Sequence, residues 1–383
     1  MDDWMIERRI PFYRASLRGR ELEYVAEVAE SGQTGGAGVF GQRCEALLEA
    51  ALGAPRVLLT TSATHALEMA ALLLRPEPGD QVIVPSFSFA TTAGAFAQHG
   101  AQPIFADIAP ESLNLDPQCV SDAIGEHTRA IVPVHYGGIA CALPELLAVA
   151  DSANIQVIED NAHGLFASSA GRALGTFGSL AALSFQQTKN FIAGEGGALV
   201  INDPALIERA EIIREKGTNR SRFMRGETDR YDWVDVGSSY VLSDLLAAFL
   251  LAQLEDRDAV QTERGDLWRR YDDGLATWAD RCHIRRPTIP ADCEPAWHMY
   301  WLIMPDRDSR DALINKLADS GIHAVFHYMP LHLSPMGRKL GGKPGDCPVT
   351  EAVSETIIRL PFYNGMDDDT LAEILDVVTS FNP

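Results

Sequence analysis

The feature that most constrains the fold is a regular alternation of short apolar runs with helical patterns over the first two-thirds of the chain. Most of the apolar runs are bounded by turn residues and separated by segments with apolar residues at helical spacing. Strands that alternate with helices in this way form mostly parallel sheets, so the pattern predicts an α/β fold with helices on both faces of one sheet. The expected strands are 56–61, 81–85, 103–107, 130–135, 155–160, 180–185 and 197–201, and the expected helices between them are 64–74, 88–99, 116–124 and 143–151.

The pattern changes from about residue 241. A mainly helical stretch to about 278 precedes a proline-rich segment at 285–295. Beyond it we expect a strand near 299–304 and helices near 308–319, 349–357 and 368–380. The chain is also too long for one ordinary domain. We therefore predict a large domain over residues 1–250 and a smaller α+β domain over residues 251–383.

The composition narrows the classes of protein to which the chain can belong. Hydrophobic residues at 46% and charged residues at 22% are typical of a folded globular protein. A formal charge of −21 argues against general binding of nucleic acid or anionic membranes, since both need positive potential. No segment matches a membrane helix or a signal peptide. The six cysteines are scattered, without a CxxC pair or a Cys/His cluster, so we expect a cytoplasmic protein with reduced thiols and no metal site.

Open parallel sheets bind ligands beyond the carboxyl ends of their strands, so the residues after each apolar run are candidate site residues. Ser62, Ala63 and Thr64 follow the first run and bring hydroxyl and backbone N–H groups to a helix start, which suits a phosphate. The same residues also make an ordinary helix cap. Phe89 follows the second run, where it either covers a planar ligand or packs in the core.

Two residues after later runs carry more chemistry. Asp160 ends the run 155–160, where a carboxylate can pair with a protonated ring nitrogen or simply cap a helix. Lys189 lies in a stretch from 173 to 204 with no other lysine or arginine, which suits an enclosed amine that loses its proton easily. The same stretch is explained about equally well if Lys189 is an exposed loop lysine that precedes a glycine-rich hairpin.

The order of these elements is more specific than any one of them. A candidate phosphate cradle, an aromatic residue, an aspartate and a lysine each follow a strand of the same predicted sheet. With this order the chain resembles the DegT/DnrJ/StrS family of sugar aminotransferases, which have the aspartate-aminotransferase-like fold, fold type I of the pyridoxal phosphate enzymes. The resemblance runs from Ile10-Pro11-Phe12 to Leu360-Pro361-Phe362-Tyr363. It is strongest to transaminases that form dTDP-4-amino-4,6-dideoxygalactose, whose hallmark stretch is echoed at 215–221, 225–226 and 235–240.

The resemblance implies pyridoxal 5′-phosphate as the cofactor and a role for each candidate residue. Lys189 would hold the cofactor covalently and move protons, and Asp160 would pair with its ring nitrogen. The other cofactor contacts that the resemblance implies are Phe89 on the ring, Ala63, Thr64 and Ser184 at the phosphate, and His163 and Ser239. His163 stands where most of the family has Gln. Ser239 falls where relatives reach the cofactor phosphate of a neighbouring subunit, which implies a homodimer with shared active sites.

The implied reaction transfers an amino group from L-glutamate to a nucleotide-linked keto-sugar. The expected acceptor is dTDP-4-keto-6-deoxyglucose, and the product a dTDP-4-amino-4,6-dideoxyhexose. Residues 214–230 contain six basic and three acidic residues, which indicates a site for the substrate phosphates, or else a solvated loop with salt bridges. The candidate substrate contacts are Arg220, Tyr328 and His332. His298 and Tyr300 are weaker candidates, since a strand in the smaller domain explains them equally well.

Four other functions share part of this pattern. A 3-keto-sugar aminotransferase of the same family and a PLP-binding regulatory protein without activity both stay open. A sugar 3-dehydrase of the same fold would have His in place of Lys189. A nicotinamide-dependent sugar enzyme would need a glycine-rich turn directly after a strand, whereas the glycines at 32–38 follow a helical pattern.

Overall fold

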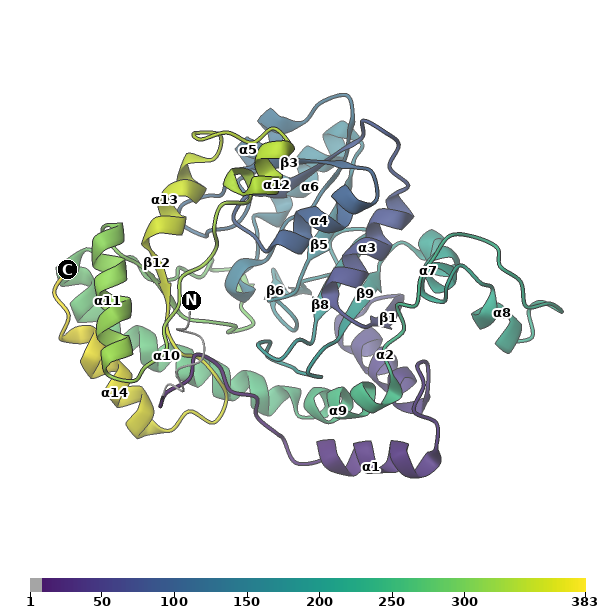
Figure 1. The fold of residues 1–383 in the computed structure, drawn as a ribbon, viewed down its shortest axis with the longest axis horizontal. Coiled ribbons are helices and arrows are strands. Elements are labelled where there is room, and N and C mark those ends of the chain that lie inside the picture. The colour runs from purple at the N-terminus through teal and green to yellow at the C-terminus, as the bar shows by residue number, and fades with distance from the viewer. Residues whose placement is uncertain (1–8) are drawn as a thin grey trace.

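The computed structural model describes residues 9–383 and contains the predicted mostly parallel sheet (Figure 1). The sheet has seven strands in the order β1-β9-β8-β5-β4-β2-β3. Their bounds are β1 (Arg56–Thr60), β2 (Gln81–Pro85), β3 (Gln102–Ala106), β4 (Thr128–Ile131), β5 (Gln156–Asp160), β8 (Leu180–Ser184) and β9 (Gly197–Ile201). β9 runs antiparallel to both of its neighbours, and the remaining neighbouring pairs are parallel.

The strands form because their side chains are apolar on both faces of the sheet. In β1, Leu58 enters the apolar core on one face, while Val57 and Leu59 enter the core on the other. β5 shows the same alternation, with Ile158 on the face of Leu58 and Val157 on the opposite face. A sheet buried on both sides needs such near-continuous apolar runs, which are the runs visible in the sequence.

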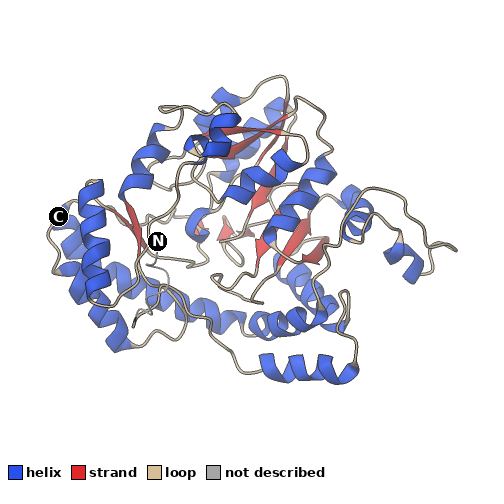
Figure 2. Cartoon of the chain, in the orientation of Figure 1, coloured by secondary structure: helices blue, strands red, loops and turns tan. Residues whose placement is uncertain are grey.

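Helices cover both faces, which confirms the α/β prediction (Figure 2). Helices α3 and α4 pack on the face of Leu58 together with α7. On the other face α1, α2 and α9 cover one end of the sheet, and α5 and α6 cover its middle and far end. Their bounds are α1 (Glu21–Ser31), α2 (Val39–Leu52), α3 (Ala63–Leu74), α4 (Ala90–Gln98), α5 (Pro117–Ala123), α6 (Leu143–Ala153), α7 (Ile207–Arg214), α8 (Arg220–Met224) and α9 (Asp244–Glu255).

The C-terminal part builds a further apolar core. Ile10 from the start of the described chain joins Tyr271, Leu302, Leu313 and Ile374 in it. Its elements are α10 (Arg257–Cys282), β11 (Trp301–Ile303), α11 (Arg307–Asp319), α12 (Pro335–Lys339), α13 (Pro348–Thr356), β12 (Ile357–Arg359) and α14 (Asp368–Thr379), with β11 and β12 antiparallel. The domain boundary between residues 250 and 251 stays a prediction.

Small elements complete the chain. A three-stranded sheet consists of β6 (Ser168–Ser169), β7 (Arg172–Ala173) and β10 (Cys293–Glu294), and short 3-10 turns lie at Tyr136–Gly138, Pro204–Leu206 and Leu331–Leu333. β4 ends earlier than expected, before Pro133, because proline has no N–H for the ladder. None of the helices in the described part of the chain is long and apolar enough to span a bilayer.

Candidate active site

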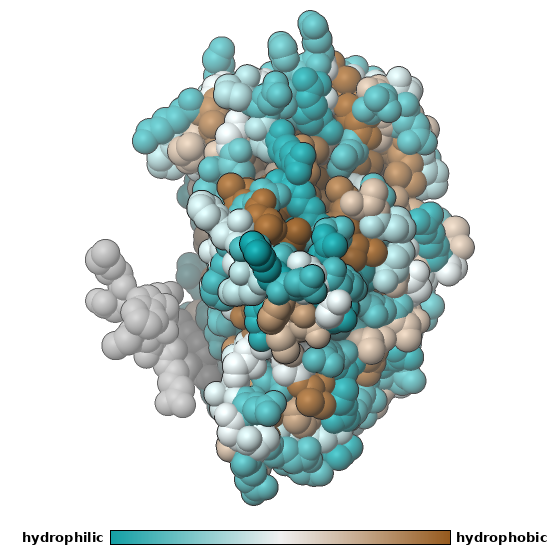
Figure 3. All heavy atoms as spheres, turned by 90° about the vertical axis from the view of Figure 1, so that its right-hand side faces the viewer, coloured by the Kyte–Doolittle hydropathy of each residue, from teal (hydrophilic) through white to brown (hydrophobic). Residues whose placement is uncertain are grey.

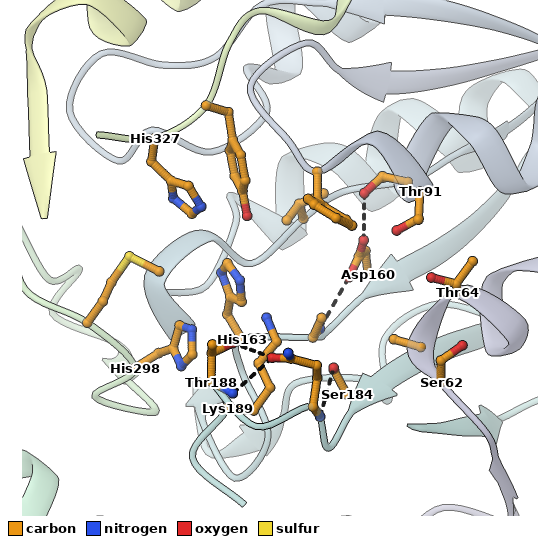
Figure 4. Close-up of a pocket in the computed structure, with 18 of the residues that line it drawn as sticks. Ser62, Thr64, Thr91, Asp160, His163, Ser184, Thr188, Lys189, His298 and His327 are labelled. Atoms are coloured by element: carbon orange, nitrogen blue, oxygen red, sulfur yellow. Dashed lines mark hydrogen bonds between the residues drawn. The ribbon is translucent and has the colours of Figure 1, made fainter. Parts of the chain in front are cut away.

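A cavity of about 670 Å³ lies at the carboxyl ends of the parallel strands. This volume is within the range of sites that bind small molecules. The sheet contributes residues that follow β1, β5 and β8, and the C-terminal part contributes His298, His327, Tyr328 and Arg359. Figure 4 shows Lys189 and Asp160 around one space, with the histidines on one side and Ser62 and Thr64 on the other.

One end of the cavity is formed by the first turn of α3. Ser62 caps this helix, and its Oγ accepts a hydrogen bond from the His65 N–H at 3.1 Å. Gly197 of β9 passes so close that a Cβ there would lie 2.3 Å from the Ala63 nitrogen, so only glycine fits. Thr64 and Ser184 line the same end of the cavity. A helix start with free N–H groups and nearby hydroxyls suits a phosphate.

Asp160 ends β5 and is almost fully buried. Its Oδ2 accepts a hydrogen bond from Thr92 Oγ1 at 2.8 Å, and its Oδ1 accepts one from the Ala162 N–H at 3.2 Å. Burial raises the pKa of Asp160, while the two hydrogen bonds and the charge of Lys189 oppose that increase. A buried carboxylate in this state favours a cationic partner, such as a protonated ring nitrogen.

Lys189 lies in the loop between β8 and β9 and also lines the cavity. The backbone N–H of Lys189 donates to the Gln186 carbonyl at 2.8 Å, and Thr188 Oγ1 donates to Gln186 Oε1 at 2.6 Å. Burial lowers the pKa of Lys189 to about 8 against the opposing charge of Asp160, and the positive charge of Arg359 adds to the decrease. Such an amine is partly unprotonated near neutral pH, as covalent reaction with a carbonyl requires.

Aromatic rings border the remaining sides. Phe89 lines the cavity with 60% of its surface exposed, and its ring centroid lies 6.5 Å from that of Tyr328. His163 stacks on His298 with centroids 4.3 Å apart and an interplanar angle of 23°. Burial lowers the pKa of both imidazoles well below the ordinary value, and the charge of Lys189 adds to the decrease. Both rings are therefore neutral near pH 7.

Three residues expected at the site do not line this cavity. His332 is wholly buried elsewhere, where Nδ1 contacts Ser86 Oγ at 2.6 Å and Nε2 contacts Glu351 at 3.0 Å. The geometry therefore offers no direct contact between His332 and a ligand in the cavity. Ser239 and Arg220 are exposed on the segment around α8, outside the cavity of their own chain.

The basic segment 214–230 carries less free charge than its composition suggests. Arg214 pairs with the buried Glu45, and Arg225 pairs with Glu211 and Glu227. Arg220 and Arg222 also have acidic partners, in Glu215 at 3.3 Å and Glu208 at 2.6 Å. The alternative of a surface loop with salt bridges therefore describes most of these arginines.

Three cavity residues stand out that the sequence did not single out as candidates. Thr92 binds Asp160 from α4, and Glu195 and Arg359 line the wall. Arg359 did leave a signal, because it interrupts the apolar run from Ile357 to Leu360. A charged residue inside a buried strand is unusual enough to mark a functional position. Thr92 left no comparable signal, since threonine in a helix is common.

The residues present fit pyridoxal phosphate. The α3 start suits its phosphate, and the exposed face of Phe89 suits its planar ring. The buried carboxylate of Asp160 suits the ring nitrogen, and the amine of Lys189 suits the carbonyl.

Comparison with known proteins agrees with this geometry. The sequence profile of the DegT/DnrJ/EryC1/StrS aminotransferase family matches residues 15–379. The chain is 32% identical to the spore coat polysaccharide biosynthesis protein SpsC of Bacillus subtilis, over 98% of both chains. It is 30% identical to the GDP-perosamine synthase of Vibrio cholerae, over 97% of this chain and 99% of that one.

The fold is similarly close to a solved structure. Spr1654 from Streptococcus pneumoniae in its pyridoxal phosphate form matches with a TM-score of 0.89 and 26% identity, over 97% of this chain and 98% of that one. The chain therefore belongs to the DegT/DnrJ/EryC1/StrS family and is a pyridoxal-phosphate-dependent aminotransferase of fold type I.

Proposed function

We propose that this aminotransferase moves an amino group from L-glutamate to a nucleotide-linked keto-sugar. The observation that carries the proposal is the cavity in which Lys189 and Asp160 meet a helix start suited to phosphate. With a volume of about 670 Å³, the cavity has room for more than a small amino acid beside the cofactor. GDP-perosamine synthase and SpsC, both named for roles in sugar metabolism, support a sugar as acceptor.

The side chains have distinct tasks in this proposal. Pyridoxal phosphate, when bound, withdraws electrons from the carbon that carries the amino group. Lys189 holds the cofactor and, once displaced by the donor amine, carries a proton on Nζ between the substrate carbon and the cofactor. Asp160 keeps the ring nitrogen protonated, while Thr92 fixes the orientation of the carboxylate. Ala63, Thr64 and Ser184 bind the phosphate, and Phe89 covers the ring.

The acceptor is proposed to be dTDP-4-keto-6-deoxyglucose, with a dTDP-4-amino-4,6-dideoxyhexose as product. The support is the resemblance of 215–221 and 235–240 to enzymes that form such products. Tyr328 lines the cavity beside Phe89 and is placed to border the sugar. A 3-keto-sugar acceptor is the main alternative, and GDP-linked sugars belong in the same comparison.

We also propose a homodimer with shared active sites, in the cytoplasm. The segment from 217 to 239 projects from the body at α8 (Figure 1). Figure 3, which faces this side of the molecule, shows hydrophobic side chains grouped around the middle of the surface. The exposed large apolar residues of this segment are Phe223, Met224, Tyr231, Trp233, Val234 and Val236. Such a surface favours burial against a second copy, which would bring Ser239 and Arg220 to the partner's cavity.

The experiment that tests the function uses both halves of the reaction. The purified protein is mixed with L-glutamate and the visible absorbance of its cofactor is followed. The aminated form is then offered a panel of dTDP- and GDP-linked 3-keto and 4-keto sugars, and products are assigned by NMR. Turnover of 4-keto sugars supports the proposal, and turnover of 3-keto sugars alone would replace its acceptor. A cofactor spectrum that does not respond to any amino donor would favour a regulatory protein without activity.

A further inference from the structure

A strained turn brings His298 to the wall of the cavity. Trp297, the residue before it, has a φ of 53°, in the left-handed region that a bulky side chain rarely adopts. Arg264 holds the turn from one side and donates to the carbonyls of Trp297 and His298 at 2.9 and 2.6 Å. Asn190 holds it from the other side, and its Nδ2 donates to the Ala296 carbonyl at 2.6 Å. Backbone strain that the surroundings hold in place points to a functional position.

The contacts of Asn190 also fix the position of the imidazole proton of His298. A backbone carbonyl only accepts hydrogen bonds, so Asn190 turns its Nδ2 towards Ala296 and its Oδ1 towards His298. Oδ1 lies 2.8 Å from Nδ1 of the imidazole, and because an amide oxygen only accepts, Nδ1 carries the proton. Burial lowers the pKa of His298 well below its ordinary value, so the ring holds a single proton. Nε2 of His298 is therefore a free acceptor.

No group in the described chain uses this acceptor. Among residues 9–383 no hydrogen bond ends at Nε2 of His298, although the residue lines the cavity. The ring of His163 stacks on it with centroids 4.3 Å apart and has the complementary arrangement (Figure 4). Nδ1 of His163 accepts from the Gly137 N–H at 3.4 Å, so this neutral ring carries its proton on Nε2. The two rings together offer the cavity one acceptor and one donor.

The two substrates of the proposed reaction differ in what they offer to the free nitrogen. L-Glutamate, once its amine has reacted, presents carboxylates, which only accept hydrogen bonds and leave Nε2 unpaired. A keto-sugar presents hydroxyl groups, which donate. The position of His298 favours a hydroxyl close to the reacting carbon. Its positioning partner Asn190 directly follows Lys189, and the charge of Lys189 adds to the lowered pKa of His298.

We propose that Nε2 of His298 accepts a hydrogen bond from the hydroxyl next to the carbonyl of the keto-sugar, and that this contact selects a hydroxylated acceptor. The inference rests on the proposed function, in which the acceptor is a nucleotide-linked keto-sugar. In dTDP-4-keto-6-deoxyglucose the group in question is the hydroxyl on C3, which is bonded to the neighbour of the reacting carbon. Asn190 is a positioning residue, because it keeps the proton on Nδ1 and Nε2 free.

The protonation of His298 is measurable without a sugar. In protein loaded with pyridoxal phosphate and labelled with ¹⁵N on its histidines, NMR near pH 7 should show a protonated Nδ1 and an unprotonated Nε2 for this residue. The signals are assigned by their loss in His298→Asn. A proton on Nε2, or on both nitrogens, would overturn the inference.

Two substitutions of similar shape test the contact itself. The amide of asparagine reaches the place of Nδ1, so His298→Asn keeps a donor to Asn190 and removes the acceptor at Nε2. The longer amide of glutamine reaches the place of Nε2, so His298→Gln keeps an acceptor there. Isothermal titration calorimetry measures the binding of dTDP-4-keto-6-deoxyglucose, and of its analogue without the C3 hydroxyl, to the pyridoxal phosphate form, which has no amino group to transfer.

The net worth of one hydrogen bond predicts that the wild type binds the keto-sugar about 3- to 10-fold more tightly than the analogue. His298→Asn should bind both compounds alike, and His298→Gln should keep part of the preference. The matched control is His127→Gln, which changes an exposed histidine between α5 and β4 and should keep the preference of the wild type.

Equal binding of both compounds by the wild type would overturn the inference, as would a preference that persists in His298→Asn. Failure of the proposed function has a different signature. In that case the wild type transfers its amino group to no nucleotide keto-sugar, and the inference falls with the function. Failure of the inference alone leaves the transfer to keto-sugars intact and removes only the preference for the C3 hydroxyl.

Discussion

The hydrogen bond from Thr92 to Asp160 offers a direct test of how the site is held. Thr92 is 1% exposed, and its Oγ1 donates to Asp160 Oδ2 at 2.8 Å. Within residues 9–383, the carboxylate accepts one other hydrogen bond, from the Ala162 N–H at 3.2 Å. The substitution Thr92→Val removes the hydroxyl and keeps the shape of the side chain. It therefore removes one hydrogen bond to the Asp160 carboxylate without opening a cavity.

The size of the effect follows from this contact. A hydrogen bond to a charged group is worth about 1.5–3 kcal/mol, which corresponds to about a 10- to 100-fold change in rate if it is lost entirely in the reaction. We expect a decrease of about tenfold, since Asp160 keeps its second hydrogen bond and its ionic partner. The pKa of Asp160 is raised by burial and lowered by the Thr92 hydroxyl. Removing the hydroxyl raises this pKa further, so the loss of activity should grow as the pH falls.

The assay is rapid mixing of the loaded enzyme with L-glutamate, followed through the visible absorbance of the cofactor, between pH 6 and pH 9. Asp160→Ala sets the scale for complete loss of the carboxylate. Thr262→Val serves as the control, because the Thr262 hydroxyl is exposed and donates to the Asp258 carbonyl of its own helix, α10. A rate for Thr92→Val equal to that of the wild type at every pH, or as low as that of Asp160→Ala, would refute the positioning role.

Three further predictions concern the cofactor, the dimer and stability. The rate at which the cofactor-free protein binds its cofactor covalently should increase with pH and level off above about pH 8, because burial lowers the pKa of Lys189 to about 8. A rate that keeps increasing towards pH 10.5 would contradict an enclosed amine. Mixing Lys189→Ala with a chain altered at Ser239 and Arg220 should restore about a quarter of the wild-type sites, because half of the dimers are hybrid and each has one intact site; no recovery after verified subunit exchange would exclude shared sites. Arg264→Met should lower the free energy of unfolding in urea by about 3 kcal/mol, because the carbonyls of Trp297 and His298 lose the hydrogen bonds that the buried guanidinium donates. Unchanged stability would contradict this role of Arg264.

Much of the fold could be predicted because its signals are local. Apolar runs of five or six residues mark strands that are buried on both faces, and the observed β2 and β9 match the expected bounds. The convergence of Ser62, Asp160 and Lys189 could be predicted for a related reason. Parallel strands present their carboxyl ends at one edge, so residues that follow different strands meet there.

The sequence by itself therefore determined the α/β class, the order of the strand-end residues and the family. The tertiary structure alone decided which distant residues neutralise a charged side chain, which bury a candidate site residue, and which close the wall of the cavity. Arg214 forms an ion pair with Glu45, which lies 169 residues away in the sequence. His332 is hydrogen-bonded to Ser86, which lies 246 residues away. Arg359 reaches the cavity only because β12 pairs with β11 on the C-terminal side. Charge pairing, burial and the closing wall of a site depend on contacts between segments far apart in the chain, and no local pattern records them.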